Sequence, residues 1–379
     1  MNNENKNSLG NNSEQTSAKR KKVMYVPDEE VLAYSRAKNV ENETKAETII
    51  NDEKSNENKP KRKNKFLTIL EKILPYKGDR PLSIAIKCIA IVAAIGLIVS
   101  GTYLYIYFSD ISYQNGKIDN VRNTYDLNRD DYSKNEDDQF SKFDVLKQQN
   151  SDIIGWITIK NTEVDNPVYQ TTDNQFYVDH DMDKKYNSYG ALFLDYRCDI
   201  DPKSLTQNQI IYGHHMRYGA MFGTLPKFRD LEFYKKSPTI SFDSLYEQRV
   251  YKIFAVMVVN DAEDETFGYS YTAYRTVFTS DTDFLDWIKH SRERSLIDTT
   301  VDVTVNDEII TLSTCCYDYD NARLVVLARL VRPGESTEVN TADAVKNTDV
   351  IYSKEYYKKK GLKIPVVSSQ SSTSSEKKD

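Results

Sequence analysis

The sequence is poor in the residues that define several common classes of protein. Its four cysteines, at positions 88, 198, 315 and 316, are too few for a disulfide-rich scaffold and lack the CxxC pairs of a zinc site. Its net charge of -6 provides no basic field for a nucleic acid partner. It also has only four histidines, so each can be considered individually. The length of 379 residues is nevertheless sufficient for a sizeable core.

The N-terminal segment is polar and contains few aromatic residues. Residues 1 to about 65 are rich in Asn, Lys, Glu and Ser. Such a segment cannot bury enough apolar surface to offset its ordering entropy, so we expect disorder, with a small folded cap as the alternative. Residues 66–76, FLTILEKILPY, could form a short amphipathic helix near a membrane.

A long uncharged run lies between residues 88 and 108, CIAIVAAIGLIVSGTYLYIYF. It matches the roughly 20 residues that a helix needs to cross a bilayer. Lysine and arginine precede it and acidic residues follow it, so the positive-inside rule predicts a cytoplasmic segment at 1–83 and a transmembrane helix at 84–108. Residues 109–138 would then be a flexible extracellular linker. A buried core helix is the alternative, whereas a cleaved signal peptide fits poorly because the run starts too far from the N-terminus.

Residues 139–333 have the pattern of a globular domain made mainly of short strands. Their density favours a closed barrel or a sandwich. FDVLKQQNSDIIGWITI predicts a helix that runs into a strand, and a second helix is predicted at 280–295 with Phe284, Leu285 and Ile288 on one face. The polar residues 334–379 are expected to be a mostly disordered tail. The other predicted strands are NPVYQ, GALFLDY, NQIIYGHH, RVYKIFAVMVV, TTVDVTV, EIITLSTC and ARLVVLARL.

The stretch ITLSTCCYDYDNARLVVLARL brings reactive residue types to two strand ends. Alternation along EIITLSTC places Cys315 on the polar face, at the end of its strand. If CYDYDN is a hairpin loop, Arg323 opens the next strand beside the thiol. A guanidinium favours a thiolate and can donate hydrogen bonds to a developing oxyanion. An inert core cysteine is the alternative, and the arginine at the matched strand end argues against it.

A thiolate that expels an amine needs a proton donor, and histidine is the usual one. His214 and His215 follow an apolar strand and a glycine in IIYGHHMRYG, at another junction of strand and loop. His290 is expected on the solvated side of its helix, and His180 has acidic neighbours typical of a surface residue. A pair of histidines can also suggest a metal, but no third ligand has a recognisable spacing.

These motifs resemble the transpeptidase sortases, and especially their class B branch. TLSTC with an arginine eight residues after its cysteine, and YGHH about a hundred residues upstream, carry the resemblance. It extends over about residues 140–332, with motifs in the family's order and spacing. Papain-like enzymes place cysteine before histidine, which disfavours that family. The supporting segments are GWITIKNTEVDNPVYQ, NQFYVDHDMDKKYNSYGALFLDYR and YDYDNARLVVLARL.

The resemblance implies a mainly β fold: a closed β-barrel of about eight strands with peripheral helices, preceded by one transmembrane helix. It implies Cys315 as the nucleophile, His214 as the acid and base, and Arg323 as the oxyanion-stabilising and substrate-positioning residue. It implies no metal and no organic cofactor. The sequence departs from the class B pattern at Cys316, where an acidic residue is usual, and the roles of Cys316 and Cys198 stay open.

The expected activity follows from the same resemblance. The enzyme would sit in the cell membrane with its catalytic domain outside, cleave a C-terminal sorting motif of secreted proteins through a thioester, and transfer the acyl group to an amine of the cell wall. The amine would come from a cell-wall precursor or from peptidoglycan. One alternative is a catalytically weak sortase-like binding or scaffold protein. Another is a cysteine protease that uses water as the acceptor.

Overall fold

The computed structural model describes residues 72–75 and 77–365. The chain divides into two compact units, Met1–Ser100 and Gly101–Asp379, and each is described by itself. The predicted disorder of residues 1–65 and most of the predicted helix at 66–76 lie outside the described residues.

The uncharged run predicted to cross a membrane is helical. It lies within α3 (Pro81–Asp126), which begins in the first unit and ends in the second. Among the described residues, α3 is the one helix whose length and composition would allow it to span a bilayer. Near its start, Lys87 forms an ion pair with Asp79 at 2.6 Å.

Within the second unit, α3 continues to Asp126, where the sequence predicted a flexible linker. The ring of Tyr125 stacks on Trp156 with centroids 4.1 Å apart, and its hydroxyl donates to Asp243 at 2.8 Å. The prediction for residues 109–138 is therefore wrong in its first half, because a buried helix face docks this segment on the barrel. The buried residues recur every three or four positions: Gln114, Ile118, Val121 and Tyr125.

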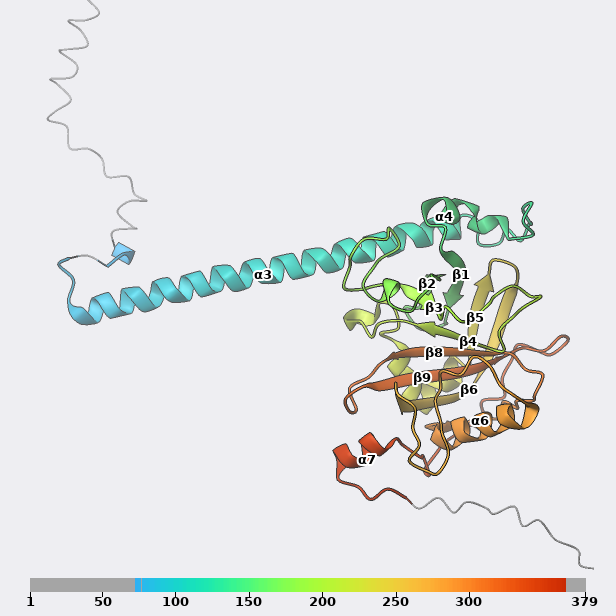
Figure 1. The fold of residues 1–379 in the computed structure, drawn as a ribbon. Helices are drawn as coiled ribbons and strands as arrows, with labels where there is room; N and C mark the ends of the chain where they lie inside the picture. Colours follow the sequence, from blue (N-terminus) through green and yellow to red (C-terminus); the bar gives the residue numbers. More distant parts are fainter. Residues whose placement is uncertain (1–71, 76, 366–379) are drawn as a thin grey trace, which may run out of the picture. The chain divides into compact units, whose positions relative to one another are not determined.

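The second unit is built around the predicted closed barrel, with strand order β1-β2-β3-β4-β8-β9-β6-β5 (Figure 1). The pairs β2/β3 and β4/β8 are parallel and the other neighbours are antiparallel. The strands are β1 (Ile153–Thr158), β2 (Asp165–Tyr169), β3 (Leu192–Leu194), β4 (Asn208–Tyr212), β5 (Thr239–Ser244), β6 (Gln248–Asn260), β8 (Ile309–Cys315) and β9 (Ala322–Leu330).

The predicted helix at 280–295 is confirmed as α6 (Asp281–Arg294). Phe284 and Ile288 are buried as expected, but Leu285 is 42% exposed and Trp287 takes its place. These side chains pack on the outward residues of β6 and β9, where Figure 1 shows α6 against the barrel. Between α3 and α6 lie the helices η1 (Ser141–Phe143), α4 (Asp144–Gln149), η2 (Phe176–Val178), η3 (Arg217–Gly219), η4 (Leu225–Arg229) and α5 (Leu231–Lys236).

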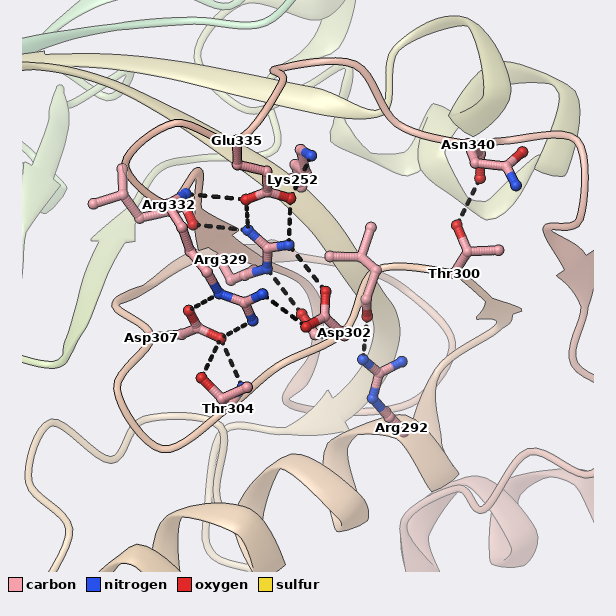
Figure 2. Close-up of polar contacts among 12 residues, drawn as sticks. Lys252, Arg292, Thr300, Asp302, Thr304, Asp307, Arg329, Arg332, Glu335 and Asn340 are labelled. Atoms are coloured by element: carbon pink, nitrogen blue, oxygen red, sulfur yellow. Dashed lines mark hydrogen bonds and ion pairs between the residues drawn. The ribbon is translucent and has the colours of Figure 1, made fainter.

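Residues 299–305, predicted as the strand TTVDVTV, form no strand. Arginines at the end of β9 hold this segment through side-chain bonds instead (Figure 2). Arg329 Nε donates to the Asp302 carbonyl at 2.8 Å, and Arg332 binds both carboxylate oxygens of Asp307 at 2.7 Å. Of the polar residues in this segment, Asp302 pairs with Arg329 and Arg332, whereas Thr300 and Thr304 form hydrogen bonds elsewhere, so the alternation of apolar and polar residues does not lead to strand pairing.

The polar C-terminal segment is ordered as far as residue 365, contrary to the predicted disorder. β10 (Val345–Lys346) pairs with β7 (Ile297–Asp298), and α7 (Lys354–Lys360) follows. Tyr357 is only 7% exposed. A few tyrosines and backbone pairing therefore anchor a segment whose overall composition is polar.

Candidate active site

The ends of β8 and β9 place Cys315 directly opposite Arg323. The strands are antiparallel, and their register pairs Ser313 with Val325 and Cys315 with Arg323. Paired residues project to the same face of a sheet, so the thiol and the guanidinium are cross-strand neighbours. The hairpin predicted from the sequence is confirmed, with residues 316–321 as its loop.

β4 brings His214 to the same end of the barrel. It runs parallel to β8 with Tyr212 paired to Ser313, and the Gly213 N–H donates to the Ser313 carbonyl at 3.1 Å. A Cβ at Gly213 would lie 2.3 Å from Leu192 Cδ2, so this close approach requires glycine. The packing around Gly213 therefore determines where the backbone leaves β4 and where His214 begins the loop.

A cavity of about 320 Å³ opens over these strand ends. Cys315, His214 and Arg323 all line it, so the three residues predicted from separate stretches of sequence meet there. His215 does not line it; its ring lies 5.5 Å from that of Tyr317. The volume is at the lower end of the range for small-ligand pockets, about 300–1,000 Å³.

The imidazole of His214 is oriented by a backbone carbonyl. Its Nε2 lies 2.7 Å from the carbonyl oxygen of Val178, which can only accept a hydrogen bond. In this arrangement Nε2 carries a hydrogen, and Nδ1 is the nitrogen left to exchange a proton with a bound group.

Arg323 is held by an acidic residue that the sequence did not reveal. Its Nη2 donates to Asp261 Oδ2 at 2.8 Å, and its Nη1 donates to the carbonyl of Ala322 at 3.2 Å. Asp261 follows the end of β6 and also lines the cavity. No motif marks it, because its position depends on the pairing of β6 with β9.

The buried carboxylate of Asp195 binds two residues that line the cavity. Asp195 Oδ2 accepts hydrogen bonds from Asn174 and from the Tyr212 hydroxyl, both at 3.0 Å. Arg197 binds both oxygens of Asp195, at 2.9 and 2.8 Å. Burial alone would raise the pKa of Asp195, but the hydrogen bonds from Arg197 dominate and lower it. The carboxylate therefore stays charged and fixes two residues that line the cavity.

Comparisons with known proteins agree on one family. A family model described as the Sortase domain matches residues 157–331. The Sortase B of Staphylococcus aureus is 31% identical over 202 residues, which cover 53% of this chain and 79% of that protein. The Sortase B of Listeria monocytogenes is 37% identical over 188 residues, which cover 49% of this chain and 72% of that protein.

Solved structures give the same result. Sortase B from B. anthracis is 32% identical with a TM-score of 0.52, over 59% of this chain and 99% of that one. The Staphylococcus aureus sortase B–substrate complex is 28% identical with a TM-score of 0.52, over 58% of this chain and 97% of that one. The chain belongs to the sortase family. Its relatives are class B enzymes, so this sortase is a cysteine transpeptidase of that class.

The sortase departs from the usual class B pattern at Cys316, and the structure explains what that residue contacts. Cys316 is 6% exposed, and its thiol interacts with Asp318, which Arg229 of η4 binds at 3.0 and 2.6 Å. Burial raises the pKa of Cys316 to about 12. Cys316 is therefore a neutral, buried residue beside the Arg229–Asp318 ion pair. All four cysteines are free.

The other unexplained residues lie away from the cavity. Cys198 is buried, its thiol contacts the Asn208 carbonyl at 3.5 Å, and burial raises its pKa to about 12. His180 stacks on Phe176, while His290 pairs with a glutamate on its own helix. Within the described part of the chain, no three His, Cys, Asp or Glu side chains gather as metal ligands.

Proposed function

We propose that this sortase is anchored in the cell membrane by α3, with its catalytic domain outside the cell. There it cleaves a C-terminal sorting motif of secreted proteins and transfers the new carboxyl end to an amine of the cell wall. Positive charges before the apolar run and acidic residues after it support this orientation.

We assign Cys315 as the nucleophile, His214 as the acid and base, and Arg323 as the oxyanion-binding residue. The observation that carries this assignment is the meeting of the three side chains at one cavity. The β8–β9 register supplies the first pair, and the parallel β4–β8 pairing adds the histidine. The Staphylococcus aureus sortase B has been solved as a complex with its substrate, which supports a role of this fold in substrate binding.

The first half of the reaction forms a thioester. Cys315 loses its proton to His214, and the thiolate attacks the carbonyl carbon of the scissile peptide bond. The carbonyl oxygen becomes an oxyanion that Arg323 stabilises with N–H groups not engaged by Asp261. The C–N bond then breaks, and the departing amine takes the proton from His214.

The second half transfers the acyl group. The incoming amine attacks the thioester and gives one proton to His214, while Arg323 again stabilises the oxyanion. The C–S bond breaks, the thiolate of Cys315 is released, and a new amide bond remains. A wet site would allow hydrolysis instead, so the acceptor must occupy the cavity while the thioester exists.

Two alternatives predict different outcomes. A sortase-like scaffold without activity would have no need of the Cys315–Arg323 register or of a histidine at the same cavity. A cysteine protease would resolve the thioester with water. Product analysis with and without a panel of amine acceptors separates these cases: transfer product that appears only with an amine supports the transpeptidase, and equal hydrolysis in both supports the protease.

The orientation is tested on intact cells with a membrane-impermeant thiol reagent. We expect Cys315 to be labelled from outside, and protease shaving to remove the barrel domain. A Cys315→Ala variant is the control for labelling at other cysteines. Labelling of Cys315 only after lysis would place the catalytic domain in the cytoplasm and refute the proposed location. It would not contradict the assignment of the catalytic residues.

A further inference from the structure

The C-terminal segment beyond the matched family domain is fixed to the catalytic domain. The family match ends at residue 331, yet the chain continues along the barrel through β10. The Ile351 N–H donates to the Glu293 carbonyl at 2.9 Å. Ser353 is 3% exposed, and the ring of Tyr356 contacts that of Tyr319 in the β8–β9 loop at 6.4 Å. The segment therefore has a defined place beside the active-site loop.

The solvent-exposed surface of this C-terminal segment is basic. Five exposed lysines occur within ten residues against one glutamate, Glu355, in a chain whose net charge is -6. We call this set the tail lysines: Lys354, Lys358, Lys359, Lys360 and Lys363. Lys360 lies 5.9 Å from the ring of Tyr356. Lys358, Lys359 and Lys363 are exposed and form no ion pair within the described part of the chain.

Apolar side chains stand among the tail lysines. A left-handed Gly361, with φ of 65°, ends α7, and the Leu362 N–H donates to the Tyr357 carbonyl at 2.9 Å. A leucine at this position of a helix stop commonly packs back on the helix. Here Leu362 stays 56% exposed and Ile364 40% exposed. Leu362 is thus exposed between Lys360 and Lys363, and Ile364 is exposed next to Lys363.

Helix stability alone does not account for this surface. Lysines in the last turn of α7 do complement the negative end of its dipole. That effect fades within one turn, whereas Lys354 lies at the start of the helix and Lys363 beyond its end. It also gives no reason for an exposed Leu362.

We propose that the tail lysines with Leu362 and Ile364 form a docking surface for an anionic lipid membrane. Cationic side chains around exposed aliphatic ones are the pattern of segments that lie in a lipid headgroup layer: the charges meet lipid phosphates and the apolar groups enter the acyl boundary. A soluble polyanion would use the lysines but not the aliphatic pair. Docking would hold the β8–β9 loop near the bilayer in addition to the anchor.

The test uses the full chain in liposomes, with Leu362→Trp as the reporter. Liposomes of phosphatidylcholine alone are compared with liposomes that also contain phosphatidylglycerol, each with brominated acyl chains that quench nearby indoles. The unsubstituted protein supplies the background of the buried Trp156 and Trp287. We expect strong quenching only with phosphatidylglycerol, and its loss at about 0.5 M salt, where charges are screened over a few ångströms.

Matched variants separate charge at this surface from charge in general. Lys358→Gln/Lys359→Gln/Lys363→Gln in the reporter background should reduce the tail's association with the anionic bilayer by about tenfold or more. The corresponding arginine variant should retain it. A control variant that removes three exposed lysines elsewhere on the domain should also retain this association. It is Lys160→Gln/Lys203→Gln/Lys289→Gln.

Each other outcome would overturn the proposal. Equal quenching in both lipid mixtures would mean that charge is irrelevant, and no quenching would mean that the tail does not touch the bilayer. Soluble polyphosphate could instead protect the tail lysines from an amine-acylating reagent while the brominated lipids do not quench the reporter indole. That result would assign the surface to a soluble polyanion. Peptide cleavage in detergent, measured in parallel, should be unchanged in every variant, so a failure here is distinguishable from a failure of the proposed function.

Discussion

Replacing Arg323 with lysine is the sharpest perturbation of the proposed oxyanion site. Arg323→Lys keeps the charge and most of the stem but removes the planar fork. A guanidinium carries five N–H groups. In the structure one binds Asp261 at 2.8 Å and one binds the Ala322 carbonyl at 3.2 Å, which leaves three for a substrate oxyanion. A lysine ammonium that stays with Asp261 presents no comparable fork to the substrate.

The size of the effect follows from the two interactions of this residue. Loss of one oxyanion donor lowers kcat by about 10²–10³, which corresponds to roughly 3–4 kcal/mol. The pair with Asp261 is weaker, because the side chains are 27% and 37% exposed. Pairs exposed to that extent contribute about 1 kcal/mol or less. Arg323→Lys should therefore lose at least about a hundredfold in kcat/KM, whereas Asp261→Asn should lose about fivefold or less.

The assay is cleavage of the best peptide from a panel of quenched fluorescent sorting motifs. Both variants should melt within a few degrees of the parent, since neither residue lies in the core. Arg323→Lys activity within about threefold of the parent would refute oxyanion stabilisation by this side chain. An equally severe loss in Asp261→Asn would show that the ion pair, rather than the free N–H groups of Arg323, is what catalysis needs.

Three further predictions concern the neighbouring cysteines, the two adjacent histidines and Asp165 of β2. Cys315→Ala should abolish peptide cleavage, while Cys316→Ala should retain most of it, because the buried Cys316 thiol has a pKa of about 12 and stays neutral. His214→Ala should be severely impaired and His215→Ala mildly, because only the first lines the cavity. Asp165→Asn should lower the free energy of unfolding at pH 7 by about 1–3 kcal/mol, since this carboxylate accepts hydrogen bonds from an indole, a threonine and an arginine.

The Asp165 prediction has a pH signature. Burial would raise the pKa of Asp165, but the hydrogen bonds from its three donors outweigh burial and lower it. A carboxyl with a lowered folded-state pKa contributes stability that is fully present above its unfolded value, about 4, and is lost as the pH falls further. Thermal melts from pH 7 to pH 3 should thus decline more steeply in the parent than in Asp165→Asn. Parallel profiles would contradict this account.

Two other results would contradict the site assignment. Equal loss in Cys315→Ala and Cys316→Ala would mean that the register does not identify the nucleophile. A more severe defect in His215→Ala than in His214→Ala would move the acid and base role to the second histidine. Circular dichroism of each variant distinguishes loss of chemistry from loss of fold.

Much of the site could be predicted from the sequence because it lies at strand ends. Strand alternation and a short loop were enough to pair Cys315 with Arg323, and the structure has that register. His214 was recognisable by its place after an apolar strand and a glycine. Asp261 was not recognisable, since only the antiparallel pairing of β6 with β9 brings it to Arg323. Long-range pairing of that kind leaves no local pattern.

The segments on either side of the barrel domain show the limit of composition as a guide. The region after residue 108 and the region after Pro333 are both polar, yet both dock on the domain. In α3 the signal was present, because Ile118, Val121 and Tyr125 recur at helical spacing. In the C-terminal segment, the pairing of β10 with β7 and a few tyrosine contacts are enough to hold the chain on the domain. These contacts produce no periodic pattern in the sequence.

Intact-protein mass spectrometry after brief mixing with a sorting peptide tests the proposed chemistry most directly. We expect an added mass equal to the N-terminal part of the peptide, located on Cys315 by fragmentation. This mass should disappear when an amine acceptor is added, and the same peptide fragment should appear in an amide-linked product. The adduct should be absent in Cys315→Ala. An acyl adduct on any other residue, or peptide cleavage by the Cys315→Ala enzyme, would contradict a thioester at Cys315 as the intermediate of this sortase.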